Sequence, residues 1–182
     1  MKLLFQKKNN FHNEWYVNNT VLSDEEKNYI SKAAIIISTK LSEYGINKTN
    51  FGLIHSDCRF SNILKDESGY IIIDFDDCGD GWYMYDVASV FGFNENHPYV
   101  ETAKERLLNG YTSSRKLAEA DIKMLDTFIM MRQIGLIGTG MFFEKYAVCG
   151  AGESLKEINQ WHAFYHQTAI SACEYCRKNQ IR

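Results

Sequence analysis

The chain has 182 residues, of which 45% are hydrophobic, 14% aromatic and 24% charged, and its formal net charge is −3. This length and composition predict one packed domain, residues 1–182, and argue against a disordered chain. The slight negative charge disfavours general binding to nucleic acid, which needs a basic face.

The first predicted element is a helix that follows an N-terminal stretch, residues 1–22, without clear periodicity. Ser23 and Glu26 match a capping box, which satisfies backbone groups at the start of a helix. Apolar residues then recur at helical spacing from Ile30 to Tyr44, and Gly45 is a typical helix stop. The pattern predicts a helix over residues 23–44.

Short strands and a polar loop are predicted next. Residues 51–54 are expected to form a short buried strand, and residues 55–62 a polar loop. Residues 63–64 and 70–73 are apolar and flank the turn-forming sequence at 66–69. They predict a small β-hairpin directly after the loop.

The rest of the chain is predicted to be helical. Helices are expected at residues 85–91, at 99–108 after the only proline, and at 118–146, which is apolar on every face as in a central buried helix. An apolar stripe along residues 155–176 predicts a last helix. The fold class is therefore α+β, mainly α, with a small β-hairpin.

Cysteine usage and hydropathy predict the compartment. Five cysteines at irregular spacing do not form a disulfide framework, which favours the reducing cytoplasm. The N-terminus has too short an apolar run for a signal peptide. The most apolar stretch, residues 128–143, is interrupted by Arg132 and Gln133, so no membrane span is expected.

Residues 51–86 contain the polar side chains that indicate a chemistry. Asp57 and Asn62 lie on one loop, and Asp74 follows twelve residues after Asn62 at the end of an Ile-rich strand. A hairpin would bring Asn62 and Asp74 to the same end, several residues from Asp57 along the loop. Phosphoryl transfer needs a carboxylate beside the acceptor hydroxyl and oxygen ligands for Mg²⁺. The pattern supplies one such carboxylate and two metal-facing oxygens.

These residues carry a family resemblance. The sequence His-Ser-Asp-x-x-x-x-Asn at 55–62, followed by Ile-Asp-Phe-Asp-Asp at 73–77, resembles the aminoglycoside phosphotransferase and choline kinase-like family, relatives of the protein kinases. The resemblance implies transfer from ATP to a small-molecule hydroxyl. It implies that Asp57 is the catalytic base or the group that orients the acceptor hydroxyl, and that Asn62 and Asp74 bind Mg²⁺ and, through it, the nucleotide.

The same resemblance assigns roles around the loop. Asp86 looks like the family's buried Asp that braces the catalytic loop, and His55 looks like a second structural support. Arg59 occupies a position from which a basic side chain can reach the transferring phosphate, although a solvated or salt-bridged side chain is an equal alternative. Ser56 stands where the family usually has glycine, a departure that concerns the loop backbone.

The resemblance is to one lobe only. Family members have an N-terminal lobe with a Gly-rich loop and a phosphate-binding Lys, and before His55 this chain has only Gly45 and Gly52 and no such Lys strand. The chain is therefore expected to be the helical C-terminal catalytic lobe, with little activity alone. An apolar face left where the other lobe would dock predicts a homodimer, or capture of that lobe as partner.

Several alternatives stay open at this point. The chain is either the lobe of a phosphotransferase or a non-catalytic, partner-binding remnant, and the Asp-Phe-Asp-Asp pattern also resembles a bacterial Ser/Thr protein kinase branch. The acceptor is not indicated. His162, His166, Cys173 and Cys176 resemble zinc ligands, but on one helix the cysteines lie ~10 Å from His166, too far for one ion.

Overall fold

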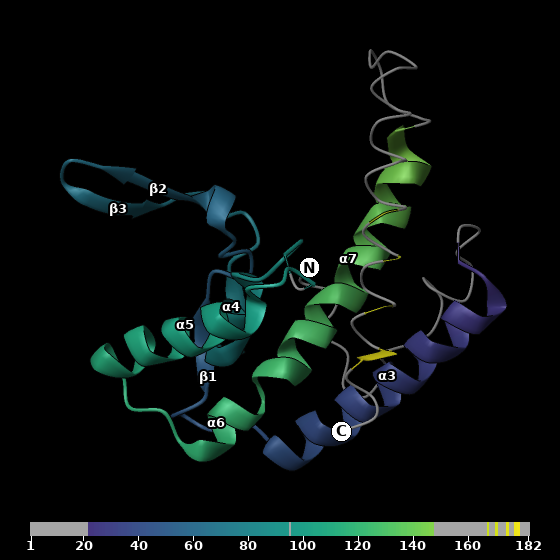
Figure 1. Ribbon diagram of the computed structural model, residues 1–182, viewed down its shortest axis with the longest axis horizontal. Helices are drawn as coiled ribbons and strands as arrows, with labels where there is room; N and C mark the ends of the chain where they lie inside the picture. Colours follow the sequence, from purple (N-terminus) through teal and green to yellow (C-terminus); the bar gives the residue numbers. More distant parts are fainter. Residues whose placement is uncertain are drawn as a thin grey trace.

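The computed structural model describes residues 22–94 and 96–147, together with residues 167, 170, 174, 177 and 178. Within that part the expected α+β, mainly helical architecture is confirmed (Figure 1). The elements in chain order are α3 (Asp24–Tyr44), β1 (Phe51–Ile54), the 3-10 turn η1 (Phe60–Asn62), β2 (Ile63–Asp66), β3 (Gly69–Ile72), β4 (Gly79–Trp82), α4 (Tyr83–Ser89), α5 (Val100–Ser114), α6 (Glu119–Lys123) and α7 (Leu125–Ala147).

Helix α3 begins and ends where the sequence predicts. The hydroxyl of Ser23 accepts from the backbone N–H of Glu26, and the Glu26 carboxylate accepts from the backbone N–H of Ser23, so the capping box is complete. At the other end Gly45 has a φ of 66°, and its N–H donates to the carbonyl of Leu41. This left-handed conformation is the one that favours glycine at a helix end.

Two separate two-stranded antiparallel sheets frame the polar loop. The predicted hairpin is confirmed as β2–β3, with Asp66 opposite Gly69. The other sheet pairs β1 with β4, a strand that the sequence analysis missed because its Gly-Asp-Gly-Trp sequence lacks apolar alternation. A Cβ at Gly52 would lie 2.3 Å from the hydroxyl oxygen of Tyr83, so a larger residue in β1 would force the Tyr83 ring of α4 to move.

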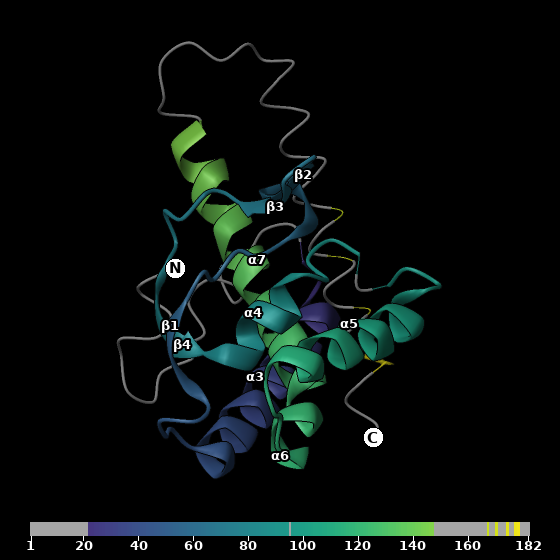
Figure 2. The ribbon, with the colours of Figure 1, turned by 90° about the vertical axis from the view of Figure 1, so that its left-hand side faces the viewer.

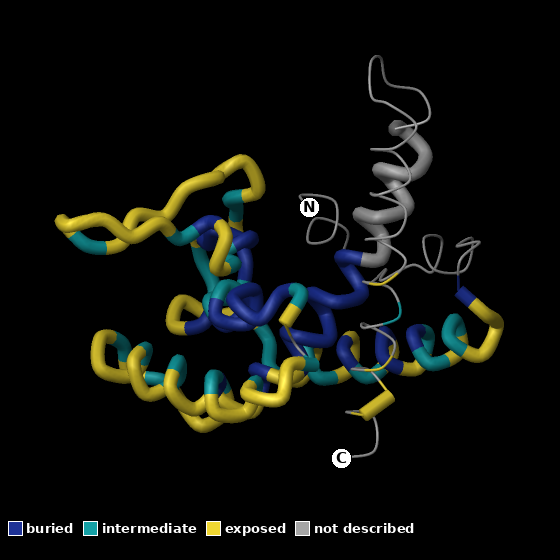
Figure 3. The backbone as a smooth tube through the Cα atoms, turned by 45° about the horizontal axis from the view of Figure 1, so that its top comes forward, coloured by how far each residue is buried: buried dark blue, intermediate teal, exposed yellow. Residues whose placement is uncertain are grey.

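The β2–β3 hairpin projects away from the helices (Figure 1), and the tube coloured by burial shows it largely exposed (Figure 3). Its apolar residues face outward: Tyr70 is 73% exposed, and Leu64, Ile71 and Ile72 are exposed as well. The expectation of a fully buried strand at 51–54 was wrong, since Leu53 is 75% exposed and only Ile54 is buried. By the strand register, Leu64 and Ile71 lie on one side of the hairpin and Tyr70 and Ile72 on the other; we refer to these four residues together as the hairpin face.

Three predicted helices differ from the structure in their boundaries. Helix α4 begins at Tyr83 and ends at Ser89, two residues earlier at each end than predicted. Helix α5 continues to Ser114, because the polar sequence after residue 108 gives no apolar stripe to follow. The single helix expected over 118–146 is instead α6 and α7, which meet at Met124.

The core lies where α7 crosses α4 and α3 (Figure 2). Phe128 of α7 is fully buried at its centre, and the rings of Tyr44, Trp82 and Tyr85 surround it at centroid distances of 6.1, 5.8 and 6.4 Å. Burying a side chain of this size contributes ~1.5–3 kcal/mol. Trp82 also donates through its indole N–H to the carbonyl of Gly45, which ties β4 to the end of α3.

Some sequence predictions concern segments beyond this description. Among the described residues no helix is both long and apolar enough to cross a membrane. The N-terminal stretch before residue 22 and most of the last predicted helix lie outside the described residues. So do the four residues weighed as zinc ligands, His162, His166, Cys173 and Cys176.

Candidate active site

Side chains of helix α4 bind the backbone of the polar loop that follows β1. Asp86, in the first turn of α4, accepts the backbone N–H of His55 at 2.8 Å through Oδ2 and that of Ser56 at 2.7 Å through Oδ1. Ser89, one turn later, accepts the N–H of Cys58 at 2.9 Å. The geometry agrees with Asp86 as the brace of the loop, and it adds Ser89, which the sequence analysis did not identify.

Ser56 has an unusual backbone conformation. Its φ of 71° lies in the left-handed region, where a side chain costs free energy and glycine does not. Ser56 therefore adopts a backbone conformation that glycine, the family's usual residue here, would adopt at no such cost. The contacts of the Ser56 backbone with Asp86 and, as described below, with Arg132 maintain the conformation despite this cost.

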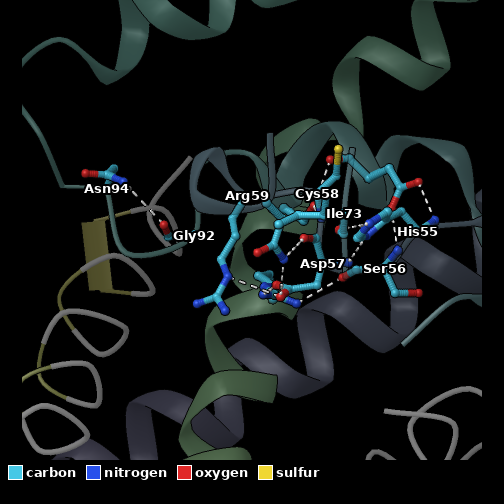
Figure 4. Close-up of polar contacts among 12 residues, drawn as sticks. His55, Ser56, Asp57, Cys58, Arg59, Ile73, Gly92 and Asn94 are labelled. Carbon is cyan, nitrogen blue, oxygen red and sulfur yellow. Dashed lines mark hydrogen bonds and ion pairs between the residues drawn. The ribbon is translucent and has the colours of Figure 1, made fainter. Parts of the chain in front are cut away.

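The carboxylate of Asp57 is nearly buried and accepts from several donors. Asn62 Nδ2 donates to the Asp57 carbonyl at 2.9 Å and to Asp57 Oδ2 at 3.0 Å. Arg59 places its Nε 3.2 Å from the same Oδ2, and its guanidinium also lies over the ring of Phe93, 5.7 Å from the centroid. Figure 4 shows Arg59 reaching back toward Asp57. In this structure Arg59 is salt-bridged, which is one of the two alternatives considered for it; a contact with phosphate stays a prediction.

The predicted metal ligands, Asn62 and Asp74, are joined through the backbone. The N–H of Ile73 donates to the carbonyl of Asn62 at 3.0 Å, so the residue before Asp74 is paired directly with Asn62. Both hydrogen-bond acceptors of Asn62 Nδ2 are oxygens, which identifies that atom as the amide nitrogen and leaves the side-chain oxygen available to a cation. Asp74 is exposed, has a φ of 66°, and its carboxylate has no protein partner among the described residues.

His55 connects the loop to the segment that carries Asp74. Its Nδ1 accepts the backbone N–H of Asp57 at 3.3 Å, so the ring proton is on Nε2, which donates to the carbonyl of Ile73 at 2.9 Å. The ring also packs against Phe75 at a centroid distance of 4.6 Å. Both ring nitrogens of His55 thus have partners inside the protein, and its role as a structural support stays a prediction.

Arg132 is the charged residue of the site that the sequence analysis did not assign. It lies on α7, its side chain is only 5% exposed, and Nη2 forms an ion pair with Asp57 Oδ1. Its Nη1 donates to the carbonyl of Ser56 at 3.0 Å. Arg132 is the single charged residue of the apolar stretch 128–143, and this feature could have identified it from the sequence, because arginine is almost never buried without a partner.

Burial and neighbouring charge change the ionisation of several groups. Burial raises the pKa of Asp86, although the N–H donors of His55 and Ser56 oppose the change. Burial also raises the pKa of the Cys58 thiol, with the negative Asp86 and Asp57 acting in the same direction. A protonated thiol is a poor nucleophile, so Cys58 does not offer a second chemistry at this site.

The donor set around the loop suits a hard cation that keeps its waters. Among the described residues no group of three or more His, Cys, Asp or Glu side chains could hold a metal ion. One amide oxygen and one exposed carboxylate, at Asn62 and Asp74, are the kind of set that Mg²⁺ accepts when phosphates and water complete its shell. Zinc, which prefers nitrogen and sulfur ligands, has no such cluster in this part of the chain.

A braced His-Ser-Asp loop, with an Asn and an Asp at the end of the following hairpin, defines a kinase-like phosphotransferase fold. The family model described as "Phosphotransferase enzyme family" matches residues 14–121, more than half of the chain, and the chain belongs to this family. The resemblance inferred from the sequence is thereby confirmed.

Individual relatives agree with this assignment. The chain is 21% identical over 143 residues to amicoumacin kinase of Bacillus subtilis (strain 168), covering 74% of this chain and 42% of that protein. A solved structure described as a microcompartment-associated aminopropanol kinase is 29% identical, with a TM-score of 0.72 over 92% of this chain and 51% of the other.

A second solved structure, amicoumacin kinase hAmiN in complex with AMP-PNP, Ca²⁺ and Ami, is 18% identical with a TM-score of 0.54, over 87% of this chain and 50% of the other. At this identity the likeness supports the shared fold. The chain spans about half the length of the relatives it matches.

Proposed function

We propose that this chain carries the catalytic and metal-binding loops of an ATP-dependent phosphotransferase that acts on a hydroxyl group of a small molecule. The observation that carries the proposal is the double donation of Asn62 Nδ2 to Asp57. It fixes the carboxylate of Asp57 and the side-chain oxygen of Asn62 in one rigid unit. Phosphoryl transfer depends mainly on such positioning and on charge stabilisation.

Each predicted site residue has a role in this proposal. Asp57 accepts the hydrogen of the acceptor hydroxyl and orients its oxygen toward the phosphate. Asn62 and Asp74 hold Mg²⁺, which supplies neutralisation of the charge on the phosphate oxygens. Arg59 is half-buried and attached to Asp57 by one nitrogen, so its remaining N–H groups are placed to contact the transferred phosphate. His55 and Asp86 maintain the loop.

The acceptor class is inferred from the relatives. One similar structure is that of an aminopropanol kinase, and the most general reading of that name is an amino alcohol. An amino alcohol offers a hydroxyl for transfer and an ammonium group that favours a slightly acidic protein. Amino alcohols are therefore the first acceptors to test, before aminoglycosides, sugars and hydroxyl-bearing peptides.

Calorimetric titration of ATP into the purified chain, with and without Mg²⁺, tests the metal site. We expect Mg²⁺-dependent binding that is lost in Asp74→Asn. Asp80→Asn is the matched control, because Asp80 is exposed on β4 and the same charge is removed there. Equal loss in both variants, or ATP binding that ignores Asp74, would contradict the assignment of the ligand.

Transfer of labelled phosphate from ATP to amino alcohols tests the reaction itself. Asp57→Asn should abolish transfer while keeping ATP binding, because it removes the hydroxyl-orienting charge and not the metal ligands. Equal transfer by the variant would contradict the role of Asp57. The expectation of little activity from this chain alone stays a prediction, and robust turnover that depends on Asp57 would overturn it. Peptide acceptors in the same assay test the protein kinase alternative.

The hairpin face supports a proposal about association. The hairpin exposes two apolar side chains on each of its sides, and exposed apolar surface of this kind is typical of interaction sites. We propose that this face mediates contact with a second copy of the chain, with a nucleotide-binding lobe as the competing partner. Light scattering on the purified chain distinguishes a dimer from a monomer that remains monodisperse at high concentration.

A further inference from the structure

Arg132 brings helix α7 into direct contact with the catalytic loop. Its guanidinium pairs with Asp57 Oδ1 and with the carbonyl of Ser56, residues 75 and 76 positions away in the chain. A further hydrogen bond joins it to Tyr85 of α4, itself fully buried. Arg132 of α7 therefore contacts both the loop and α4.

Burying a guanidinium is costly unless its charge and its hydrogens are matched. Burial alone would lower the pKa of Arg132, yet Tyr85 and Asp57 hold it above its ordinary value, so the side chain stays charged. The cost of this arrangement can be recovered only through the contacts that Arg132 makes. Those contacts end on the two residues, Ser56 and Asp57, that define the direction of the proposed base.

The backbone of Ser56 is held from both sides by opposite charges. Asp86 Oδ1 accepts its N–H, and Arg132 Nη1 donates to its carbonyl. Since Ser56 has a φ of 71°, this pair of contacts fixes the peptide planes on either side of an unfavourable backbone conformation. The next residue along the chain is Asp57, so the clamp fixes where its side chain starts.

The two oxygens of Asp57 are thus bound differently. Oδ1 is paired with a fully enclosed arginine on a core helix, whereas Oδ2 meets Asn62 and the half-buried Arg59. Arg59 has 35% of its side chain exposed and contacts Asp57 only through Nε, so it can turn toward a phosphate. Arg132 has no such freedom, because Asp57, Ser56 and Tyr85 all hold it.

We propose that Arg132 is a positioning residue: it fixes Oδ1 of Asp57 so that Oδ2 is the oxygen presented to the acceptor hydroxyl. This role rests on the proposed phosphotransfer, but the geometry that it requires can be tested without turnover. Arg132 acts through Asp57 and does not itself contact the reacting atoms. The orientation of the Asp57 carboxylate is then fixed by two different helices: directly by α7, and through Ser56 by α4.

Nuclear magnetic resonance of the whole chain offers a direct readout. The Asn62 side-chain amide donates to Asp57 Oδ2, so its exchange with solvent reports whether that oxygen is in place. Four successive backbone amides, at 55–58, donate to partners inside the protein and report the loop. The amides of the β1–β4 sheet, which lies outside the 55–58 loop, serve as internal controls.

Two variants of Arg132 and one of Asp57 complete the design. Arg132→Met removes the charge, whereas Arg132→Lys keeps it but cannot serve Asp57 and Ser56 together. We expect the Asn62 side-chain amide and the amides of Asp57 and Cys58 to exchange about tenfold faster or more in Arg132→Met. Arg132→Lys should give an intermediate rate, and the β1–β4 amides should be unchanged in both.

A double variant separates positioning from simple core packing. If Arg132 acts through the carboxylate, the single variant Asp57→Asn should already speed the exchange of the Asn62 side-chain amide. Adding Arg132→Met should then speed it little further. Independent effects that multiply, or unchanged exchange at Asn62 in both Arg132 variants, would overturn the proposal. If Arg132→Met does not fold, Arg132→Lys alone decides by the same criterion.

Transfer kinetics distinguish this inference from the proposed function. Where the transfer assay gives turnover, Arg132→Lys should lower kcat about tenfold or more and leave KM for ATP unchanged. A loss confined to KM would contradict the positioning role. Absence of transfer by the wild-type chain alone is the expected result, and the exchange results would still decide whether Arg132 holds Asp57.

Discussion

Replacing Ser56 with glycine should stabilise the protein or leave it unchanged, although most substitutions of buried loop residues destabilise. The reason is the φ of 71°, a conformation that costs a residue with a side chain about 1–2 kcal/mol and costs glycine nothing. Against this gain, glycine loses more entropy on folding, worth about 0.5–1 kcal/mol. The net expectation is a gain of about 0–1.5 kcal/mol in the free energy of unfolding.

A matched control removes the entropic term. Ser42 is exposed on α3, in an ordinary helical conformation, so Ser42→Gly should lose the same about 0.5–1 kcal/mol without the compensating gain. The two glycine variants should therefore differ by about 1–2 kcal/mol. Ser56→Ala keeps the Cβ and removes only the hydroxyl, which separates backbone conformation from any contact of that oxygen.

Urea unfolding followed by circular dichroism measures the free energy of unfolding of all three variants. The comparison requires that the m-value, its dependence on urea concentration, is the same in each. A Ser56→Gly variant destabilised as much as Ser42→Gly would refute the reasoning, because the backbone would then not be strained at Ser56. Destabilisation by both Ser56→Ala and Ser56→Gly would instead assign the importance of this residue to its hydroxyl.

Three further predictions concern α4 and the hairpin. Asp86→Ala should lower the free energy of unfolding by about 2–5 kcal/mol in urea melts, since it leaves two buried N–H groups without acceptors; a loss below about 1 kcal/mol would contradict the brace. The pKa of Asp86 is raised in the folded state, so protonation of this carboxyl stabilises the fold at pH below its ordinary pKa. That stabilisation is lost as pH rises. Measured against Asp86→Asn, the stability of the wild type should therefore fall as pH rises above about 4, and a rise would mean a lowered pKa. Ile71→Lys on the hairpin face should reduce self-association in light scattering without changing the unfolding midpoint, and Glu67→Lys at the exposed turn is its control.

The site illustrates how one loop is controlled by residues of opposite charge on different helices. Asp86 of α4 binds backbone donors, and Arg132 of α7 binds a backbone acceptor and the carboxylate of Asp57. The loop between them contributes Asp57 and, after one turn of 3-10 helix, Asn62. Rigid positioning of this kind is what phosphoryl transfer requires of a protein, since the reaction needs little covalent chemistry from it.

Local sequence determined much of this molecule. The capping box at Ser23, the stop at Gly45 and the turn at 66–69 are short-range features, in which neighbouring side chains satisfy backbone groups, and all three are present. The order of Asp57, Asn62 and Asp74 was likewise enough to indicate the family and the chemistry, because these residues act from one loop and one hairpin. Their individual roles stay predictions until the variants are measured.

Tertiary structure alone decided which distant residues meet. Strand β4 has no apolar pattern of its own and exists because β1 pairs with it. Asp57 and Arg132 are separated by 75 positions, and nothing in their local sequences links them. The sequence marked Arg132 only as a charge inside an apolar stretch; the crossing of α7 over α4 placed that charge beside Asp57, because a buried guanidinium must find an anion.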